Sequence, residues 1–346
     1  MHKCIPAIRE KTNIPLLHIV DATAKEMLKN NIDSALLLGT RFTMEEEFNI
    51  KRFKENIDSI LSQVDKLIII ENGSRESDKI IKIIKSYDEN CVKLVVNSKN
   101  MGIARALNQI MVCAEKENYK WVITLDQDSV CPENLVKEYS KYIEEDNVAI
   151  ICPQIQDRRR KYLELEETEG ISEIDMCITS ASCTNVKIWR DVKGFDSKLF
   201  IDLVDNEYCK KVRLYGYKIL RLNYLILNHE FGDIEPKNTW TAKMFIKLSK
   251  MLHKENIGKL SYKKKVYPLR VYYTCRNVLY LNKKYKNYGI VGYEENYHCH
   301  NFGGFIICFV LPSILRADKK MEVLRAAMKG IRDGRGLARK TEVWVK

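Results

Sequence analysis

The sequence predicts an α/β fold with a mostly parallel sheet, because short apolar strands alternate with amphipathic helices along its first half. The segment QVDKLIIIENGS, residues 63–74, is a β-branched apolar run that ends in the turn Asn72-Gly73-Ser74. A second run, WVITLD at 121–126, also ends in polar residues. Open α/β sheets bind ligands at the carboxyl ends of such strands, so we expect the functional site at this edge.

Between these two strands lies a predicted helix within residues 97–116. It follows the flexible tripeptide Asn100-Met101-Gly102, and its apolar residues recur at helical spacing. These residues are Ile103, Ala106, Leu107, Ile110 and Met111. Strand, turn, helix, strand, loop and helix in this order indicate successive βα units, which build a parallel sheet.

Two carboxylates, Asp126 and Asp128, follow the second strand. Separated by one residue in an extended segment, they can hold a divalent cation together with the diphosphate or ribose that it accompanies. Mg²⁺ and Mn²⁺ prefer oxygen ligands of this kind. An acidic turn after a strand is the simpler interpretation, so the pair gains weight only from other motifs.

Composition indicates one large domain with additions in a reducing cytoplasm. The 346 residues can bury a sizeable core, and no secretory signal peptide is seen at the start. The 11 cysteines lack paired CxxC spacing, so we expect buried thiols and no disulfides.

The formal charge of +12 is concentrated after residue 258, where Lys and Arg flank the apolar run FIICFVLPSIL at 305–315. That run is too short to span a bilayer, which takes about 20 apolar residues. One interpretation is an interfacial contact of this region with an anionic membrane surface. The alternative is a buried helix with a solvated basic face. No nucleic-acid module is present, so nucleic acid is not expected as a partner.

Several motifs together resemble the rhamnosyltransferase branch of the family-2 glycosyltransferases, over roughly residues 50–340. They are ENGS at 71–74, NxGIAxAxN at 100–108, LDQDS at 125–129, GFDSKLFIDLVDNEYCKKVRLYGYKI at 194–219, LNHEFGD at 227–233 and YYTCRNVLYLNKKY at 272–285. The resemblance implies a GT-A fold, Mg²⁺ or Mn²⁺, and inversion at the anomeric carbon. It also implies a dTDP- or UDP-sugar donor and a glycan or lipid-linked acceptor. Because acceptors of the family are often lipid-linked, we expect the protein in the cytoplasm, peripheral at the inner face of the cell membrane.

The resemblance assigns roles at the cation. Asp128 would ligate the metal, and Asp126 would contact the ribose or a metal-bound water. His229 would complete the metal or diphosphate site. A lone histidine can also be structural, but its position in the LNHEFGD motif favours the functional interpretation.

For the base that takes the acceptor proton we predict Asp205 in LVDNEY, with Glu207 as the fallback. Asp205 matches the second acid of a family pair in which Val204 replaces the first. Asp202 matches a variable position and is the weakest candidate. All three acids would otherwise form a solvated helix amino terminus.

The predicted nucleotide site combines Glu71, Asn72, Ser74, Asn100 and Arg105. Relatives carry Asp at the place of Glu71, where the acid reads the pyrimidine edge. Arg105 would offer charge to the diphosphate. Arg276 and Asn277 match a family Arg-Asn pair that either orients the leaving group or ties the carboxyl-terminal helices to the core.

The first 47 residues resemble an interior piece of the aspartate/glutamate racemase family, in KTNIPLLHIVDATAKEM and SALLLGTRFTMEEEF. That family needs two cysteines: the first would lie upstream of Met1, and the second belongs to a GCTE-like segment that this sequence lacks. Cys4 has no partner, so we expect no racemase activity. We expect the strand at 34–39 to replace the first strand of the glycosyltransferase, before helical patterning resumes at Phe53.

We therefore expect a racemase-like segment at 1–47, a GT-A domain at 48–235 and a helical, basic region at 236–346.

Three functions compete. They are an inverting, metal-dependent glycosyltransferase, with rhamnose as the favoured sugar, a catalytically silent fusion or binding protein, and a nucleotidyltransferase suggested by Leu38-Gly39-Thr40-Arg41. The sequence lacks the repeated glycines of the nucleotidyltransferase signature, so this function is discounted.

Overall fold

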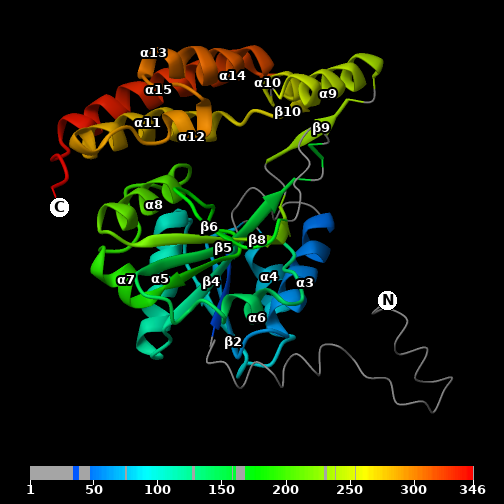
Figure 1. Ribbon diagram of the computed structural model, residues 1–346, viewed down its shortest axis with the longest axis vertical. Coiled ribbons are helices and arrows are strands. Elements are labelled where there is room, and N and C mark those ends of the chain that lie inside the picture. Colours follow the sequence, from blue (N-terminus) through cyan, green and yellow to red (C-terminus); the bar gives the residue numbers. More distant parts are fainter. Residues whose placement is uncertain are drawn as a thin grey trace.

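The computed structural model describes residues 34–38, 47–74, 76–126, 129–157, 159–160, 168–229, 232–237, 239–253 and 255–345. Figure 1 shows a sheet domain with helices on both faces, and an elongated layer of helices above it. Residues 1–33 and 39–46, which include Cys4 and most of the racemase-like motifs, lie outside the described residues, as does Asp128.

The sheet has eight strands in the order β3-β2-β1-β4-β7-β5-β8-β6. Parallel pairs join β1 to β2 and β4, β2 to β3, and β5 to β8, whereas β7 and β6 run antiparallel to their neighbours. The strands are β1 (Ser34–Leu38), β2 (Lys66–Glu71), β3 (Val92–Val96), β4 (Trp121–Asp126), β5 (Val148–Gln156), β6 (Ile171–Glu173), β7 (Ser182–Asn185) and β8 (Lys218–Asn228).

The helices of the sheet domain are α3 (Glu47–Leu61), α4 (Ser77–Ile84), α5 (Ile103–Lys116), α6 (Leu135–Tyr139), α7 (Val186–Asp191) and α8 (Val204–Leu214). One buried apolar core includes residues of α5, α7 and α8, and a second includes residues of α3, α4 and α6. The sheet separates the two, because successive side chains of a strand point to opposite faces.

The carboxyl-terminal layer contains β9 (Ile234–Pro236), α9 (Trp240–Leu252), α10 (Glu255–Gly258), η2 (Lys259–Ser261), β10 (Tyr262–Lys264), α11 (Pro268–Lys284), η3 (Lys286–Tyr288), α12 (Tyr293–Tyr297), α13 (Phe302–Phe305), η4 (Ile306–Val310), α14 (Leu311–Arg316) and α15 (Lys320–Arg339). The α11 and α15 helices pack closely. A Cβ at Gly330 would lie 2.3 Å from the Tyr272 carbonyl oxygen, so only glycine permits this approach.

The predicted α/β fold class is confirmed: a mostly parallel sheet carries a helical, basic carboxyl-terminal region. The expected strands at 66–71 and 121–126 and the expected helix behind Gly102 are present. The antiparallel β7 was not expected, because its sequence SCTN carries no long apolar run.

The strand β1 lies inside the sheet, where Leu36 pairs with Ile68 of β2 and with Thr124 of β4. A position outside the sheet would have excluded the idea that this segment supplies the first strand. The helix that follows begins at Glu47, six residues before Phe53. The likeness of residues 1–47 to a racemase is not confirmed.

Among the described residues, one helical segment, Tyr293–Arg316, is long and apolar enough to cross a membrane, judged by length and composition alone. Its backbone is interrupted at His298, where φ is 52° and α12 ends. The helical run from Phe302 to Arg316 extends roughly 22 Å at 1.5 Å per residue. This is shorter than the hydrocarbon core of about 30 Å.

Candidate functional site

The carboxyl ends of β2, β4 and β8 bring the predicted polar residues to one edge of the sheet. Asp126 is the last residue of β4, and His229 directly follows β8. A bridge between Val130 and Asn228 joins the two segments beyond the strands. His229 Nε2 lies 4.0 Å from Asp126 Oδ2, so residues about 100 positions apart face each other.

Two buried serines hold the His229 ring. His229 Nδ1 lies 2.9 Å from Ser129 Oγ, which lies 2.7 Å from Ser180 Oγ. The Asp126 amide donates to Ser180 Oγ at 3.2 Å. If Nδ1 carries the proton and donates it to Ser129, the Nε2 lone pair is directed toward Asp126. Metal-binding histidines are held by such a bond at the other ring nitrogen.

These residues fit a divalent cation. Two ligands about 2.1 Å from one cation lie about 3–4 Å apart, which matches the separation of Asp126 Oδ2 and His229 Nε2. Within the described part of the chain, no group of three His, Cys, Asp or Glu side chains gathers at one point. The third predicted ligand, Asp128, lies outside that part.

Asp205 lies in the first turn of α8 and is half-buried. Burial, together with the negative charges of Asp126 and Asp202, raises the pKa of Asp205 to about 7, although Thr179 and Arg270 act in the opposite direction. A carboxylate with this pKa accepts a proton near neutral pH far more readily than an ordinary aspartate. Asp126 is therefore near enough for its charge to act on the Asp205 carboxyl.

Asp202 precedes α8 and forms an ion pair that the sequence did not indicate. Arg270 of α11 contacts its carboxylate through Nε, at 3.1 Å, and through Nη2. The Asp202 backbone is left-handed, with φ of 65°. Asn277 donates to the carbonyl oxygens of Ile201 and Asp202 at 2.8 and 2.9 Å and supports this uncommon conformation. Helix α11 thus fixes the segment that leads into Asp205.

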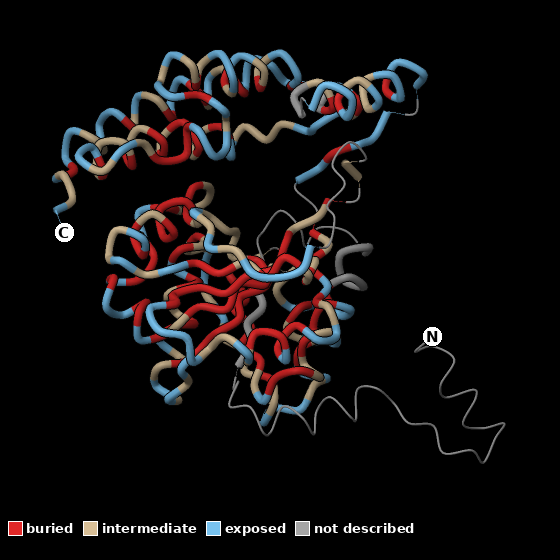
Figure 2. Tube along the Cα trace, in the orientation of Figure 1, coloured by how far each residue is buried: buried red, intermediate tan, exposed pale blue. Residues whose placement is uncertain are grey.

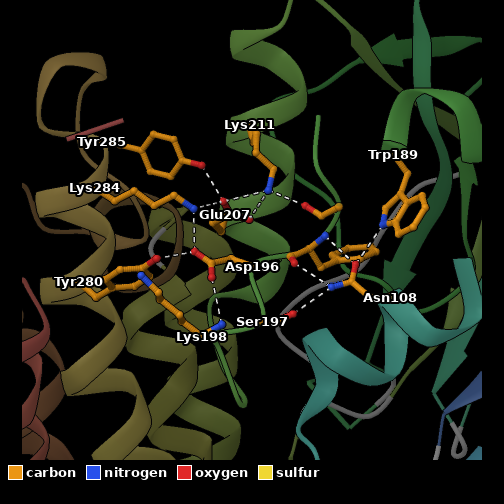
Figure 3. A network of polar contacts seen from close by, with 12 residues as sticks. Asn108, Trp189, Asp196, Ser197, Lys198, Glu207, Lys211, Tyr280, Lys284 and Tyr285 are labelled. Atoms are coloured by element: carbon orange, nitrogen blue, oxygen red, sulfur yellow. Dashed lines mark hydrogen bonds and ion pairs between the residues drawn. The ribbon is translucent and has the colours of Figure 1, made fainter. Parts of the chain in front are cut away.

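Glu207 is fully buried and is not exposed at the sheet edge (Figure 3). Its Oε1 lies 3.2 Å from Lys211 Nζ and 2.8 Å from Lys284 Nζ, and it accepts a bond of 2.6 Å from the Tyr285 hydroxyl. These contacts enclose the carboxylate in the interior, where an acceptor hydroxyl cannot reach it. We therefore do not retain Glu207 as a candidate base: its contacts join α8 to α11.

Glu71 ends β2 and is buried. Its carboxylate accepts bonds from the Ser74 amide at 2.6 Å, the Ser77 hydroxyl at 2.9 Å and the Gly73 amide at 3.3 Å. The Ser74 hydroxyl is also a partner. Glu71 therefore shapes the Asn72–Ser74 turn, a contribution that the sequence did not predict.

The Asn72 turn meets the loop before α5, as the motifs predicted. Asn72 Oδ1 accepts from the Met101 amide and from Asn97 Nδ2, both at 3.0 Å. Asn100 Oδ1 accepts from the Gly102 amide at 2.9 Å. Gly102 has φ of 85°, and a Cβ there would lie 2.8 Å from the Phe200 backbone, so glycine is required.

The two predicted arginines occupy different surroundings. Arg105 is exposed on α5. Arg276 donates to Asn277 Oδ1 at 2.9 Å, contacts the Lys198 carbonyl oxygen and lies over the Tyr273 ring at 4.9 Å. These contacts correspond to the second expectation for the Arg-Asn pair, the tie between α11 and the core.

Comparison with known proteins relates part of the chain to one protein family. Residues 45–204 match the family model described as Glycosyl transferase family 2. This part of the chain, which carries most of the α/β sheet, is therefore similar to family-2 glycosyltransferase domains.

Among curated proteins, the chain is similar to the dTDP-rhamnosyl transferase RfbF of Shigella flexneri. They are 24% identical over 200 residues, which cover 52% of this chain and 66% of RfbF, slightly less than two thirds. The solved mannosyltransferase PcManGT from Pyrobaculum calidifontis, in complex with GDP-Man and Mn²⁺, is 13% identical at a TM-score of 0.47, covering 93% of this chain and 82% of that one. The solved structure of S. aureus TarS 1–349 is 13% identical at a TM-score of 0.46, and the match covers 89% of this chain and 90% of that one.

Proposed function

We propose that this protein transfers a sugar, with inversion, from a nucleoside-diphosphate donor to a glycan or lipid-linked acceptor. The observation that supports this most is the joint position of Asp126, His229 and Asp205 at one sheet edge. Inverting transfer requires a cation site at the leaving group and a base at the acceptor, and this edge carries residues suited to each.

Asp205 is the proposed base. It would take the proton of the acceptor hydroxyl as that oxygen attacks the anomeric carbon from the face opposite the diphosphate. The Asp202–Arg270 pair and the Asn277 bonds hold the loop that ends at Asp205, so they would orient its carboxylate.

Asp126, Asp128 and His229 would hold Mg²⁺ or Mn²⁺, and the cation would neutralise charge that develops on the diphosphate. The Asn72 turn and the facing Asn100 loop would bind the nucleotide. Glu71 would act chiefly by shaping this turn, and Arg105 would supply positive charge from α5. The similarity to RfbF favours a dTDP-sugar and rhamnose over the other candidates.

Cationic side chains near Asp202 suit a phosphate-bearing acceptor. Desolvation by the surrounding chain and the neighbouring Arg270, Arg160 and Arg316 lower the pKa of Lys264 to about 8, whereas Asp202 acts in the opposite direction; the Lys264 side chain itself is exposed. A lipid-linked acceptor carries such phosphate groups, and the protein would meet it at the cytoplasmic face of the membrane.

A thermal-shift screen of dTDP, UDP and GDP, each with and without Mn²⁺, tests this function. A ligand that binds the folded state raises the melting temperature by mass action. We expect one nucleotide to stabilise the protein in a Mn²⁺-dependent manner and its sugar conjugate to release nucleoside diphosphate on turnover. No shift with any nucleotide would favour the silent protein, and pyrophosphate formed from a nucleoside triphosphate and a sugar phosphate would favour a nucleotidyltransferase.

A further inference from the structure

Helix α9 turns an apolar stripe away from the protein. Its buried residues include Ala242 and Ser249, seven positions apart on one face. The opposite face carries Trp240, Met244 and Met251, and the exposed fractions are 75% for Trp240 and 65% for Met251. Large apolar side chains at helical spacing ordinarily face a core. Here they face outward.

Positive charge borders this stripe. Lys243, Lys247 and Lys250, spaced four and three residues apart, are exposed along one side of α9. The sequence of the helix, WTAKMFIKLSKML, contains no acidic residue. An apolar stripe beside lysines is the pattern of helices that lie in the interface of an anionic membrane.

The segment η4–α14 repeats the pattern. Ile307, Leu311 and Leu315 recur every fourth residue, and Ile307 and Leu315 are 66% and 70% exposed. No charged residue occurs from Phe302 to Leu315, and the next five residues contain three cations, Arg316, Lys319 and Lys320, and one acid, Asp318.

Both stripes belong to the carboxyl-terminal layer (Figure 2), in which exposed residues follow the sides of α9 and α14 that face away from the sheet domain. On the other side of the layer, Arg270 and Asn277 of α11 contact Ile201 and Asp202, which lead into the proposed base Asp205. In Figure 1, α14 lies on the side of α11 that faces away from the sheet domain, and α9 lies beyond the start of α11.

We propose that the outward stripes of α9 and η4–α14 form one docking surface for an anionic lipid bilayer. Only their apolar side chains would enter the bilayer. The occupant follows from charge complementarity, because lysines and arginines border both stripes. A second copy of this chain would present the same positive charges to them. The run from Phe302 to Arg316 is too short to span the bilayer, so it lies along the surface.

This proposal deepens the peripheral location proposed above, and vesicle binding without donor or acceptor tests it separately from turnover. The probe is sedimentation with vesicles of equimolar phosphatidylglycerol and phosphatidylcholine, compared with pure phosphatidylcholine. Trp240 is an internal reporter: we expect its emission to shift to the blue with anionic vesicles, and the shift to disappear in Trp240→Phe while binding remains.

Paired substitutions separate the two stripes and the charges. Met244→Gln with Met251→Gln, and Leu311→Gln with Leu315→Gln, should each weaken anionic-vesicle binding roughly tenfold. The matched control Val112→Gln alters an exposed apolar residue of α5 and should leave binding unchanged. Lys243→Gln with Lys247→Gln should weaken binding to anionic vesicles roughly 20- to 30-fold and leave neutral vesicles unaffected.

Absence of binding to anionic vesicles would overturn the proposal, as would binding that none of the paired substitutions alters. Self-association in solution that the same pairs abolish, without vesicle binding, would assign the surface to a second copy of the chain instead.

Discussion

The ammonium of Lys284 lies 2.8 Å from the carboxylate of Glu207, two residues beyond the proposed base in the same helix. Lys284 also lies 2.7 Å from Asp196 Oδ2. Burial alone would lower the pKa of Lys284, but the two carboxylates outweigh it and raise the pKa. The ion pair between Lys284 and Glu207 therefore joins α11 to α8. Because Asp205 lies in α8, its position depends on the carboxyl-terminal layer.

Lys284→Met should destabilise the protein by about 3–5 kcal/mol, because it leaves a buried carboxylate without one of its cations. The free energy of unfolding in urea measures this. Lys286→Met, an exposed lysine two residues further on, is the control and should have little effect. Equal stability of the two variants would show that the Glu207 network contributes nothing.

Leu36→Pro should abolish cooperative unfolding, because proline lacks the amide proton that a central strand needs. Leu36 lies in register with both Ile68 and Thr124, so the loss affects two strand pairs. The control Leu36→Ile keeps strand propensity and should fold. A folded proline variant with wild-type unfolding would place residues 34–38 outside the sheet.

Local patterns predicted much of the fold, and contacts between distant residues account for the rest. The apolar run that ends at Glu71 and the helical spacing from Ile103 onward are short-range signals, and they predicted β2 and α5 correctly. The Asp202–Arg270 pair joins residues 68 positions apart. Nothing near Asp202 in the sequence indicates that partner. The sequence also does not distinguish Glu207 from Asp205, because the two lysines that surround Glu207 come together with it only in the fold.

Ser129→Ala should lower Mn²⁺ affinity about 10- to 100-fold while the fold survives, because the serine holds the His229 ring through Nδ1. Calorimetric titration of Mn²⁺ in the presence of the stabilising nucleotide measures the change. Ser86→Ala, at an exposed position, is the control. Unchanged Mn²⁺ affinity in Ser129→Ala would remove His229 from the cation site.

Stability should depend on pH through Asp205. Its folded pKa of about 7 exceeds the ordinary 3.8, so the folded state binds the extra proton between these values. The contribution of Asp205 to the free energy of unfolding therefore falls as pH rises through that window. Without divalent cations, Asp205→Asn should gain on the order of 2 kcal/mol relative to wild type between pH 5 and pH 8. Parallel pH dependence in the two proteins would contradict the raised pKa.

The central claim is that Asp205 takes the acceptor proton, and the most direct test compares transfer rate with donor affinity in Asp205→Asn. We predict turnover reduced ~10²- to 10⁴-fold with donor and Mn²⁺ affinities close to wild type, because only the base is lost. Glu207→Gln should lower stability while folded molecules keep their turnover. Near-normal turnover in Asp205→Asn, together with its loss in folded Glu207→Gln, would contradict this assignment.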